Sequence, residues 1–505
     1  RDVLGSRGLG DVYKRQEPLL SLAGFEEMTK TAEKSSGLIS VTGCIDAQKS
    51  QMIYAFGGHR KNKLIVTFGE QKAKELYDEY SFFDKEVVYY PSKDVLFYQS
   101  DIRGNLLTAE RIRALKAIRE QERVTLVTTF DALMNTMAPI EKMWENVLTL
   151  ELGQLLDLKE IQAALIRMGY EKEYQVQTMG QFSVRGGILD VFPLTEENPI
   201  RIELWGDEID TIRYFDCESQ KSIENTDRVS IYPAAELVLS DEEKAGGIDK
   251  LKAEAKRVSD KLRKQMKTEE AHRVTVMADE LTEEWGELSM YAGMDAFLSY
   301  FFDERVGLLD YFNSSDSLIF FDELTRCTEQ GKLTETEFSE SMKQRLAMGY
   351  ILPGQMNGLF TEKEIVAKLE KYSCIALAAL DNKANGLHQL GSYGIHCQSV
   401  SPYNNSFELL IKDLKRYKKN GYRVILLSGS RTRAKRLSED ITDQGITCFY
   451  TENYDHELFE GQIMVCYGKV RRGFEYPILK FAVITESDIF GAQQKKKKRH
   501  RTYEG

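Results

Sequence analysis

The chain has 505 residues, of which 42% are hydrophobic and 29% are charged. These values are typical of soluble globular proteins and exclude a disordered, collagen-like or coiled-coil protein, and the length predicts three or four domains of about 150 residues. The formal net charge of −11 argues against a protein that reads nucleic-acid sequence, although it leaves room for a local basic surface.

Cysteine and histidine residues give no sign of a disulfide framework or a metal site. The seven cysteines are scattered without a CxxC pair, which suits reduced thiols in the cytoplasm. None of the six histidines lies four residues from another, so we expect no metal ligands. No apolar run approaches the length of about eighteen residues that a membrane helix needs, so no membrane partner is expected.

The first half of the chain alternates between predicted strands and helices. Residues 1–16 are rich in Gly and Arg without any period, and we interpret them as a disordered or non-native leader. Both ends are interpreted as cut from a longer protein, because the chain begins with Arg1. Over residues 17–150, the repeated β-helix-β order predicts a parallel sheet with helices on its faces. The predicted strands are 38–42, 63–68, 87–90 and 123–128, and the predicted helices are 46–56, 69–82 and 105–121.

The pattern changes over residues 151–240, which predict a small α+β unit. A helix at 155–168 is followed by short apolar runs at 181–184, 187–192, 200–205 and 209–215, separated by turn signals. Short strands joined by tight turns predict an antiparallel meander.

Three further segments follow this unit. Residues 241–345 begin with charged helices and contain a strand at 317–321, and we assign them to the second half of the first fold. Residues 346–486 alternate again and are interpreted as a separate α/β domain. Residues 487–505 are interpreted as a basic linker, whose run KKKKRHR (residues 495–501) is either solvated or in contact with phosphates.

A turn at Gly43 follows the first predicted strand and opens the first predicted helix, as in a phosphate-binding loop. The consensus G-x-x-x-x-G-K-S/T is met by Gly43, Lys49 and Ser50, but Gln48 replaces the second glycine. A side chain there crowds the loop, and Asp46 adds a negative charge where nucleotide phosphates would lie. We therefore favour a decayed or accidental loop over a working nucleotide site.

A second candidate motif is the apolar run 318–321, which ends in Asp322 and Glu323. In a motor ATPase such a pair holds magnesium and orients water, but acids also end strands for solubility alone. Without an intact loop we favour solubility, while the order of the two motifs suits relics of one nucleotide fold.

The most distinctive segment is FSVRGGILDVFP (residues 182–193), followed by IRIELWGDEID (residues 200–210). The glycine pair predicts a hairpin, and the alternation places Arg201, Glu203 and Trp205 on one strand face. Residues 151–240 contain 8 Lys or Arg and 17 Asp or Glu, a composition poor for binding the DNA backbone but suited to a protein interface anchored by arginine and aromatic side chains. A hairpin whose arginines only keep it solvated is the open alternative.

Continued through residue 216, this segment resembles the UvrA-binding insert shared by UvrB and the bacterial transcription-repair coupling factors (Mfd). Residues 89–118 (YYPSKDVLFYQSDIRGNLLTAERIRALKAI) and 123–133 (RVTLVTTFDAL) are similar to the first nucleotide-fold half of these proteins. Residues 484–501 resemble the coupling factor's approach to its polymerase-interacting module. The resemblance covers about residues 20–505, and it is to the N-terminal portion of the coupling factor.

The resemblance implies an α/β architecture: a degenerate RecA-like fold (the P-loop NTPase type) split by the small α+β insert and followed by a second small α/β domain. It implies recruitment of UvrA to RNA polymerase stalled at DNA damage, in nucleotide excision repair. Intact members are ATP-dependent translocases on double-stranded DNA. Because Gly505 precedes the motor, we expect no catalytic residues here, and ATP and magnesium only in the missing domains. Gln48 departs from the intact UvrB loop, and no Tyr-rich DNA-clamping hairpin separates Pro91 from Asn105.

We predict that the UvrA-binding surface consists of Arg185, Phe192, Arg201 and Glu203, with Arg167, Tyr170 and Arg213 as outer members. Arg185 lies beside the glycine turn, where its guanidinium can project clear of the sheet. Arg201 and Glu203 share a strand face and can present opposite charges side by side, whereas Phe192 can equally pack beneath the sheet. Two alternatives stay open: an active UvrB-like ATPase that loads on damaged DNA through Lys49 and Ser50, and an architectural module that restrains the motor.

Overall fold

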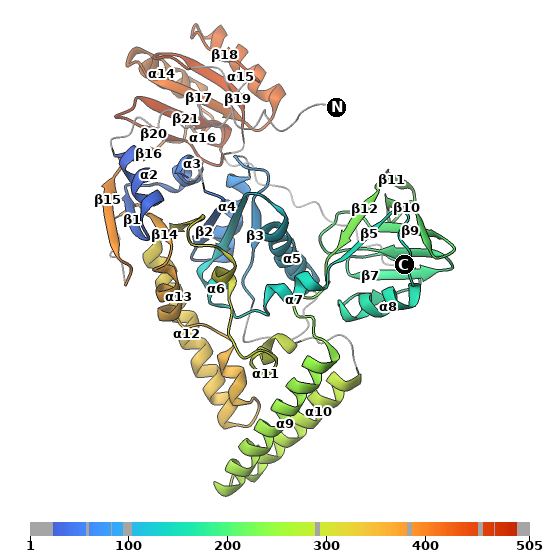
Figure 1. The fold of residues 1–505 in the computed structure, drawn as a ribbon. Coiled ribbons are helices and arrows are strands. Elements are labelled where there is room, and N and C mark those ends of the chain that lie inside the picture. The colour runs from blue at the N-terminus through green and yellow to red at the C-terminus, as the bar shows by residue number, and fades with distance from the viewer. Residues whose placement is uncertain are drawn as a thin grey trace.

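The computed structural model describes residues 24–56, 60–81, 83–93, 104–287, 293–380, 386–452, 458–468 and 470–491. The predicted leader and the basic run at 495–501 lie outside these residues. Figure 1 shows a central sheet with a smaller β-module on one side, a helical hairpin below and a second α/β unit above.

The central sheet has seven strands in the order β15-β1-β14-β13-β2-β4-β3, and every pairing within it is parallel. Most of these strands are runs of apolar residues, as expected for a sheet that helices cover on both faces. The α/β class predicted from the sequence is therefore confirmed. The strands are β1 (Gly37–Thr42), β2 (Asn62–Thr67), β3 (Val88–Tyr90), β4 (Val124–Thr129), β13 (Ser317–Asp322), β14 (Ser373–Leu377) and β15 (Gln389–Gly394).

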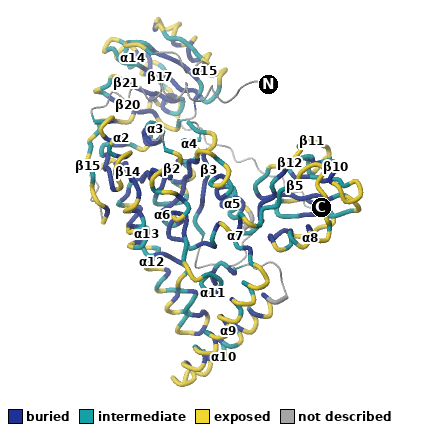
Figure 2. Tube along the Cα trace, in the orientation of Figure 1, coloured by how far each residue is buried: buried dark blue, intermediate teal, exposed yellow. Residues whose placement is uncertain are grey.

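Successive side chains of these strands enter two hydrophobic cores, one on each face. Leu64 and Phe321 belong to one core and Ile65 and Phe320 to the other, and Figure 2 shows the sheet as mostly buried. The first core is covered by α5 (Gly104–Glu120), α6 (Phe130–Met134), α7 (Ile140–Glu145), α12 (Leu324–Ala347) and α13 (Glu362–Leu369). The second is covered by α2 (Phe25–Lys34), α3 (Asp46–Phe56) and α4 (Glu70–Tyr80).

The β-module follows the first half of this sheet. Its six strands have the order β11-β10-β9-β8-β7-β6, and all pairs are antiparallel except β6 with β7, so the predicted meander is confirmed. The elements are α8 (Leu158–Arg167), β6 (Glu171–Lys172), β7 (Gln181–Arg185), β8 (Ile188–Val191), β9 (Ile200–Trp205), β10 (Glu208–Phe215) and β11 (Ser222–Asn225). A separate pair, β5 (Leu148–Glu151) with β12 (Arg228–Ile231), joins the module to the sheet domain.

A hairpin of two long helices, α9 (Asp241–Lys264) and α10 (Thr268–Glu287), projects from the central sheet (Figure 1). A capping box between Ser240 and Glu243 fixes the start of α9. The chain returns to β13 through 3-10 turns at Met294–Phe297 and Leu308–Tyr311 and the short α11 (Leu298–Phe301). None of the described helices is both long and apolar enough to cross a bilayer.

The second α/β unit has six strands in the order β16-β20-β21-β17-β19-β18. They are β16 (Gln398–Ser399), β17 (Arg423–Ser428), β18 (Phe449–Tyr450), β19 (Ile463–Tyr467), β20 (Phe474–Tyr476) and β21 (Phe481–Thr485), with α14 (Phe407–Lys419), α15 (Arg431–Asp443) and α16 (Glu486–Phe490). Its Leu427, Met464 and Tyr476 join the core that contains α3, so this unit packs against the central domain.

The predicted boundary between residues 345 and 346 is wrong. A 3-10 turn at Pro353–Asn357, helix α13 and strands β14 and β15 all follow it, and β14 lies between β1 and β13 in the central sheet. The second sheet begins only at β16. A short apolar run such as β14 fits either sheet equally well, so the sequence pattern alone could not assign it.

Candidate functional site

The turn at Gly43 is closed by backbone contacts with two other segments. Gly43 has φ +78, and a Cβ there would lie 2.0 Å from the carbonyl oxygen of Ile395, so glycine is required. The backbone N–H groups of Gly43 and Cys44 donate to the carbonyls of Ala379 and Ala378 at 3.2 and 2.9 Å. These two backbone donors at the start of the loop are thus used within the protein rather than turned toward a phosphate.

Lys49 brings the two candidate nucleotide motifs together. Its Nζ atom lies 2.6 Å from Asp322 Oδ1, 2.8 Å from Glu323 Oε1 and 3.2 Å from Asp46 Oδ1. Burial disfavours the ammonium, but the carboxylates of Asp322 and Glu323, Asp322 foremost, raise the pKa of Lys49 above its usual range. Asp322 also accepts from Thr67 Oγ1 at 2.8 Å. The lysine that would contact a phosphate is instead neutralised by three acids.

Gln48 and Ser50 are buried beside this ion cluster, with 0% and 3% of their surface exposed. Neither the Gln48 amide nor the Ser50 hydroxyl has a hydrogen-bond partner among the described residues. Helix α3, which carries them, is packed between the central sheet and the second α/β unit. This arrangement does not fit a nucleotide, because Lys49 is engaged and its neighbours face no open space.

The β-module presents a very different surface. Alternation along its strands places the apolar side chains under α8, in one core with Ile161 and Leu165. The opposite side, which we call the polar face, includes Arg185, Asp190, Arg201, Glu203, Trp205 and Arg213. The polar face is therefore the side of the sheet that the module's own helix leaves uncovered.

Two ion-pair groups organise the polar face. Arg201 donates from Nε and Nη2 to the two oxygens of Asp190 at 2.7 and 2.8 Å, and Arg185 Nη2 donates to Asp190 at 3.1 Å. Arg213 and Glu203 form a second pair at 2.6 Å. Arg201 and Glu203 were expected to present opposite charges side by side, but each is paired with an opposite charge from a neighbouring strand.

Three predicted contact residues are not on this surface. Phe192 and Tyr170 are only 8% and 2% exposed, and the Tyr170 hydroxyl donates to the carbonyl of Tyr232 at 2.6 Å. As contact residues these two were wrong predictions, because both pack in the core. Arg167 is exposed but ends α8, the helix on the apolar side of the sheet. Arg185, which was expected to project clear of the sheet, is held partly down by Asp190.

Trp205 is the residue that the predicted site omitted. It is 84% exposed at the end of β9, in the same alternating series as Arg201 and Glu203. A large exposed aromatic next to arginines is typical of a protein interface. The strand alternation was a sufficient signal, whereas the choice of Phe192 relied on its position in the motif.

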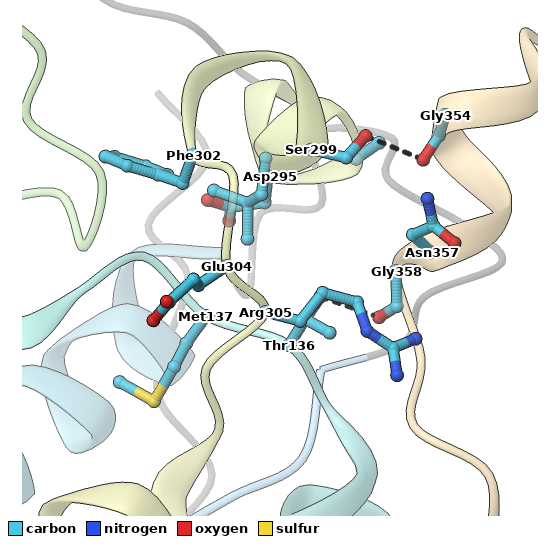
Figure 3. Close-up of a pocket in the computed structure, with 12 residues that line it drawn as sticks. Thr136, Met137, Asp295, Ser299, Phe302, Glu304, Arg305, Gly354, Asn357 and Gly358 are labelled. Atoms are coloured by element: carbon cyan, nitrogen blue, oxygen red, sulfur yellow. Dashed lines mark hydrogen bonds between the residues drawn. The ribbon is translucent and has the colours of Figure 1, made fainter.

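A small cavity at the base of the helical hairpin offers no alternative site. Asp295, Ser299, Arg305 and Asn357 are among its lining residues (Figure 3). Its volume of about 20 Å³ has room for one water molecule and no metabolite.

Comparisons with known proteins agree with the division of the chain into the β-module and the α/β part around it. Residues 148–237 match the UvrB interaction domain family. The chain is 28% identical over 437 residues to the transcription-repair-coupling factor of Bacillus subtilis (strain 168), covering 86% of this chain and 36% of that protein. It is 26% identical over 471 residues to that of Staphylococcus haemolyticus (strain JCSC1435), covering 91% and 39%.

The chain thus spans less than two fifths of the length of these two relatives. All seven cysteines are free. The resemblance predicted from the sequence is confirmed: over most of its length the chain is similar to transcription-repair-coupling factors, and residues 148–237 match the UvrB interaction domain family.

Proposed function

We propose that this chain is the part of a transcription-repair coupling factor that recruits UvrA, and that it does so without turning over ATP. Recruitment would bring UvrA to RNA polymerase stalled at DNA damage, in the cytoplasm, as a step of nucleotide excision repair. Polymerase binding, movement along double-stranded DNA and the use of ATP and magnesium would belong to the rest of such a protein.

The observation that carries the proposal is the polar face of the UvrB interaction domain. Arginines paired with carboxylates share one face with the exposed Trp205, on the side of the sheet opposite α8. Arginine offers a fixed set of donors for carboxylates, and tryptophan supplies a large contact area at little cost in side-chain entropy. Acidic and apolar groups on UvrA would complement this surface.

Replacing Trp205 by alanine in the 505-residue chain is expected to weaken UvrA binding about thirtyfold, because truncating a central aromatic anchor typically costs about 2 kcal/mol. Binding would be measured by isothermal titration calorimetry. Tyr350→Ala, which removes a 53% exposed aromatic from outside the domain, is the matched control and should bind as the unmodified chain does. Wild-type affinity in a folded Trp205→Ala variant, or no UvrA binding by the unmodified chain, would contradict the proposal; the latter favours the architectural alternative.

The closed loop leads to a prediction for the enzymatic alternative. Titration with a fluorescent ATP analogue is expected to show no saturable binding below about 1 mM, because Lys49 is already paired with three carboxylates. Gln48→Gly should not create an ATPase, since catalysis also needs magnesium and an oriented water. ATP turnover that disappears in Lys49→Ala would establish an active site here instead.

A further inference from the structure

We propose that Asp190 is a positioning residue for UvrA binding: its buried carboxylate holds the guanidinium groups of Arg185 and Arg201 in one orientation. Asp190 acts on the partner only through these arginines. The inference rests on the proposed function, since it concerns the same polar face.

Asp190 is only 1% exposed, so UvrA cannot reach it directly. Its Oδ1 atom accepts from Arg201 Nε, and its Oδ2 atom accepts from Arg201 Nη2 and Arg185 Nη2. A buried carboxylate is tolerated only when it is paired and hydrogen-bonded, and here the pairing comes from β7 and β9, the strands on either side of β8. The carboxylate therefore joins three strands at one point of the face.

Arg185 and Arg201 have different roles. Arg201 has a side chain only 12% exposed; it also donates to Gln220 Oε1 at 2.9 Å and stacks on Phe215 at 4.4 Å. The Arg185 side chain is 37% exposed, and among the described residues only its Nη2 atom donates a hydrogen bond. The Nε and Nη1 groups of Arg185 stay available to a partner carboxylate, already oriented before UvrA arrives.

The strand register explains why a carboxylate is needed at this position. Arg201 lies directly opposite Arg213 on β10, and like charges in that position repel each other. Asp190 lies directly opposite Arg201 on β8, while Glu203 pairs with Arg213. The facing Arg201 and Arg213 thus have different acids, and removing Asp190 would free Arg201 to turn and would release Arg185.

The test is a double-mutant cycle in the 505-residue chain, with UvrA affinity as the readout. Asp190→Asn, which keeps the shape and removes the charge, is expected to weaken binding about tenfold, as for a lost charge-assisted contact. In an Arg185→Gln background the same change should have an effect within about twofold, because Arg185, rather than the mostly buried Arg201, is the arginine that offers free donors to UvrA. Asp227→Asn, an exposed acid of the same domain, is the control and should change nothing.

The outcomes separate this inference from the proposed function. Unchanged affinity in Arg185→Gln and in Trp205→Ala would overturn the proposed function itself. If those two variants bind UvrA weakly while Asp190→Asn binds it normally, the positioning role is overturned and the proposed function stands. The same holds if Asp190→Asn loses the same affinity in the unmodified chain and in the Arg185→Gln background. Should Asp190→Asn fail to fold by circular dichroism, Asp190→Glu keeps the charge but displaces the guanidiniums; a folded Asp190→Glu chain with normal affinity would equally refute the role.

Discussion

Replacing Lys49 by methionine is expected to lower the free energy of unfolding by about 3–5 kcal/mol, the usual result of removing one partner of a buried ion pair. Both the Lys49 and the Asp322 side chains are only 1% exposed. The variant leaves Asp322 with the Thr67 hydroxyl but without its counter-charge. Urea denaturation followed by circular dichroism measures the change.

Two variants sharpen this experiment. Lys49→Met combined with Asp322→Leu should recover much of the loss, because replacing a whole buried pair by apolar side chains is often neutral. Lys30→Met, which breaks the exposed pair of Lys30 with Glu26, should leave stability nearly unchanged. A Lys49→Met chain as stable as the unmodified one would mean that the lysine is free to serve a ligand.

Replacing Glu236 by glutamine is expected to lower the free energy of unfolding by a similar 3–5 kcal/mol at neutral pH. Glu236 accepts from Arg111 Nε at 2.7 Å and lies 3.0 Å from Lys93 Nζ, and Lys93 also pairs with Asp295 at 2.6 Å. Arg111 is fully buried and stacks on Tyr90 at 4.1 Å. The variant leaves that guanidinium without its counter-charge at the point where the chain leaves the β-module.

The effect of Glu236→Gln has a defined pH dependence. Burial alone would raise the pKa of Glu236, but Arg111 and Lys93 lower it to about 2, from an ordinary value near 4.5. A lowered pKa stabilises the folded state above about pH 4.5, and this contribution is lost as the pH falls toward 2. The difference between the two chains should therefore be largest at neutral pH and shrink below pH 4.5.

Urea denaturation at several pH values tests this expectation. Glu151→Gln, which breaks the exposed pair of Glu151 with Arg228, is the control and should show a small, nearly constant difference. A Glu236→Gln difference that stays constant down to pH 2 would show that the carboxylate is not stabilised by its neighbours.

Local patterns in the sequence predicted the β-module well. The four apolar runs at 181–215 correspond to strands β7 to β10, because their alternation matches a sheet with one covered face. The same alternation placed Arg201 and Trp205 correctly. It could not separate contact residues from core residues near a turn, so Phe192 was chosen although it packs in the core.

Contacts between distant segments could not be predicted. Lys49 and Asp322 are 273 residues apart. Of the three acids that pair with Lys49, only Asp46 lies within the loop sequence, where it was interpreted as a charge unfavourable to nucleotide binding. The pairing of Asp190 with Arg201 could be predicted only from the register of the strands. Turn lengths limit that register but do not determine it. Arg201 was predicted only as a contact residue; because it neutralises a buried acid, Arg201→Glu would disturb the fold as well as binding.

The pairing of β5 with β12 has a consequence for how the β-module can be transferred from one protein to another. Leu148 lies opposite Ile231, at the entry to and the exit from the β-module. The module therefore begins and ends at neighbouring points of the central domain. A segment of this kind can be exchanged as a cassette without rethreading the parent sheet, since α7 and α9 need only a short bridge in its place. Grafted between the ends of an unrelated hairpin, the cassette would carry its docking chemistry to a new scaffold.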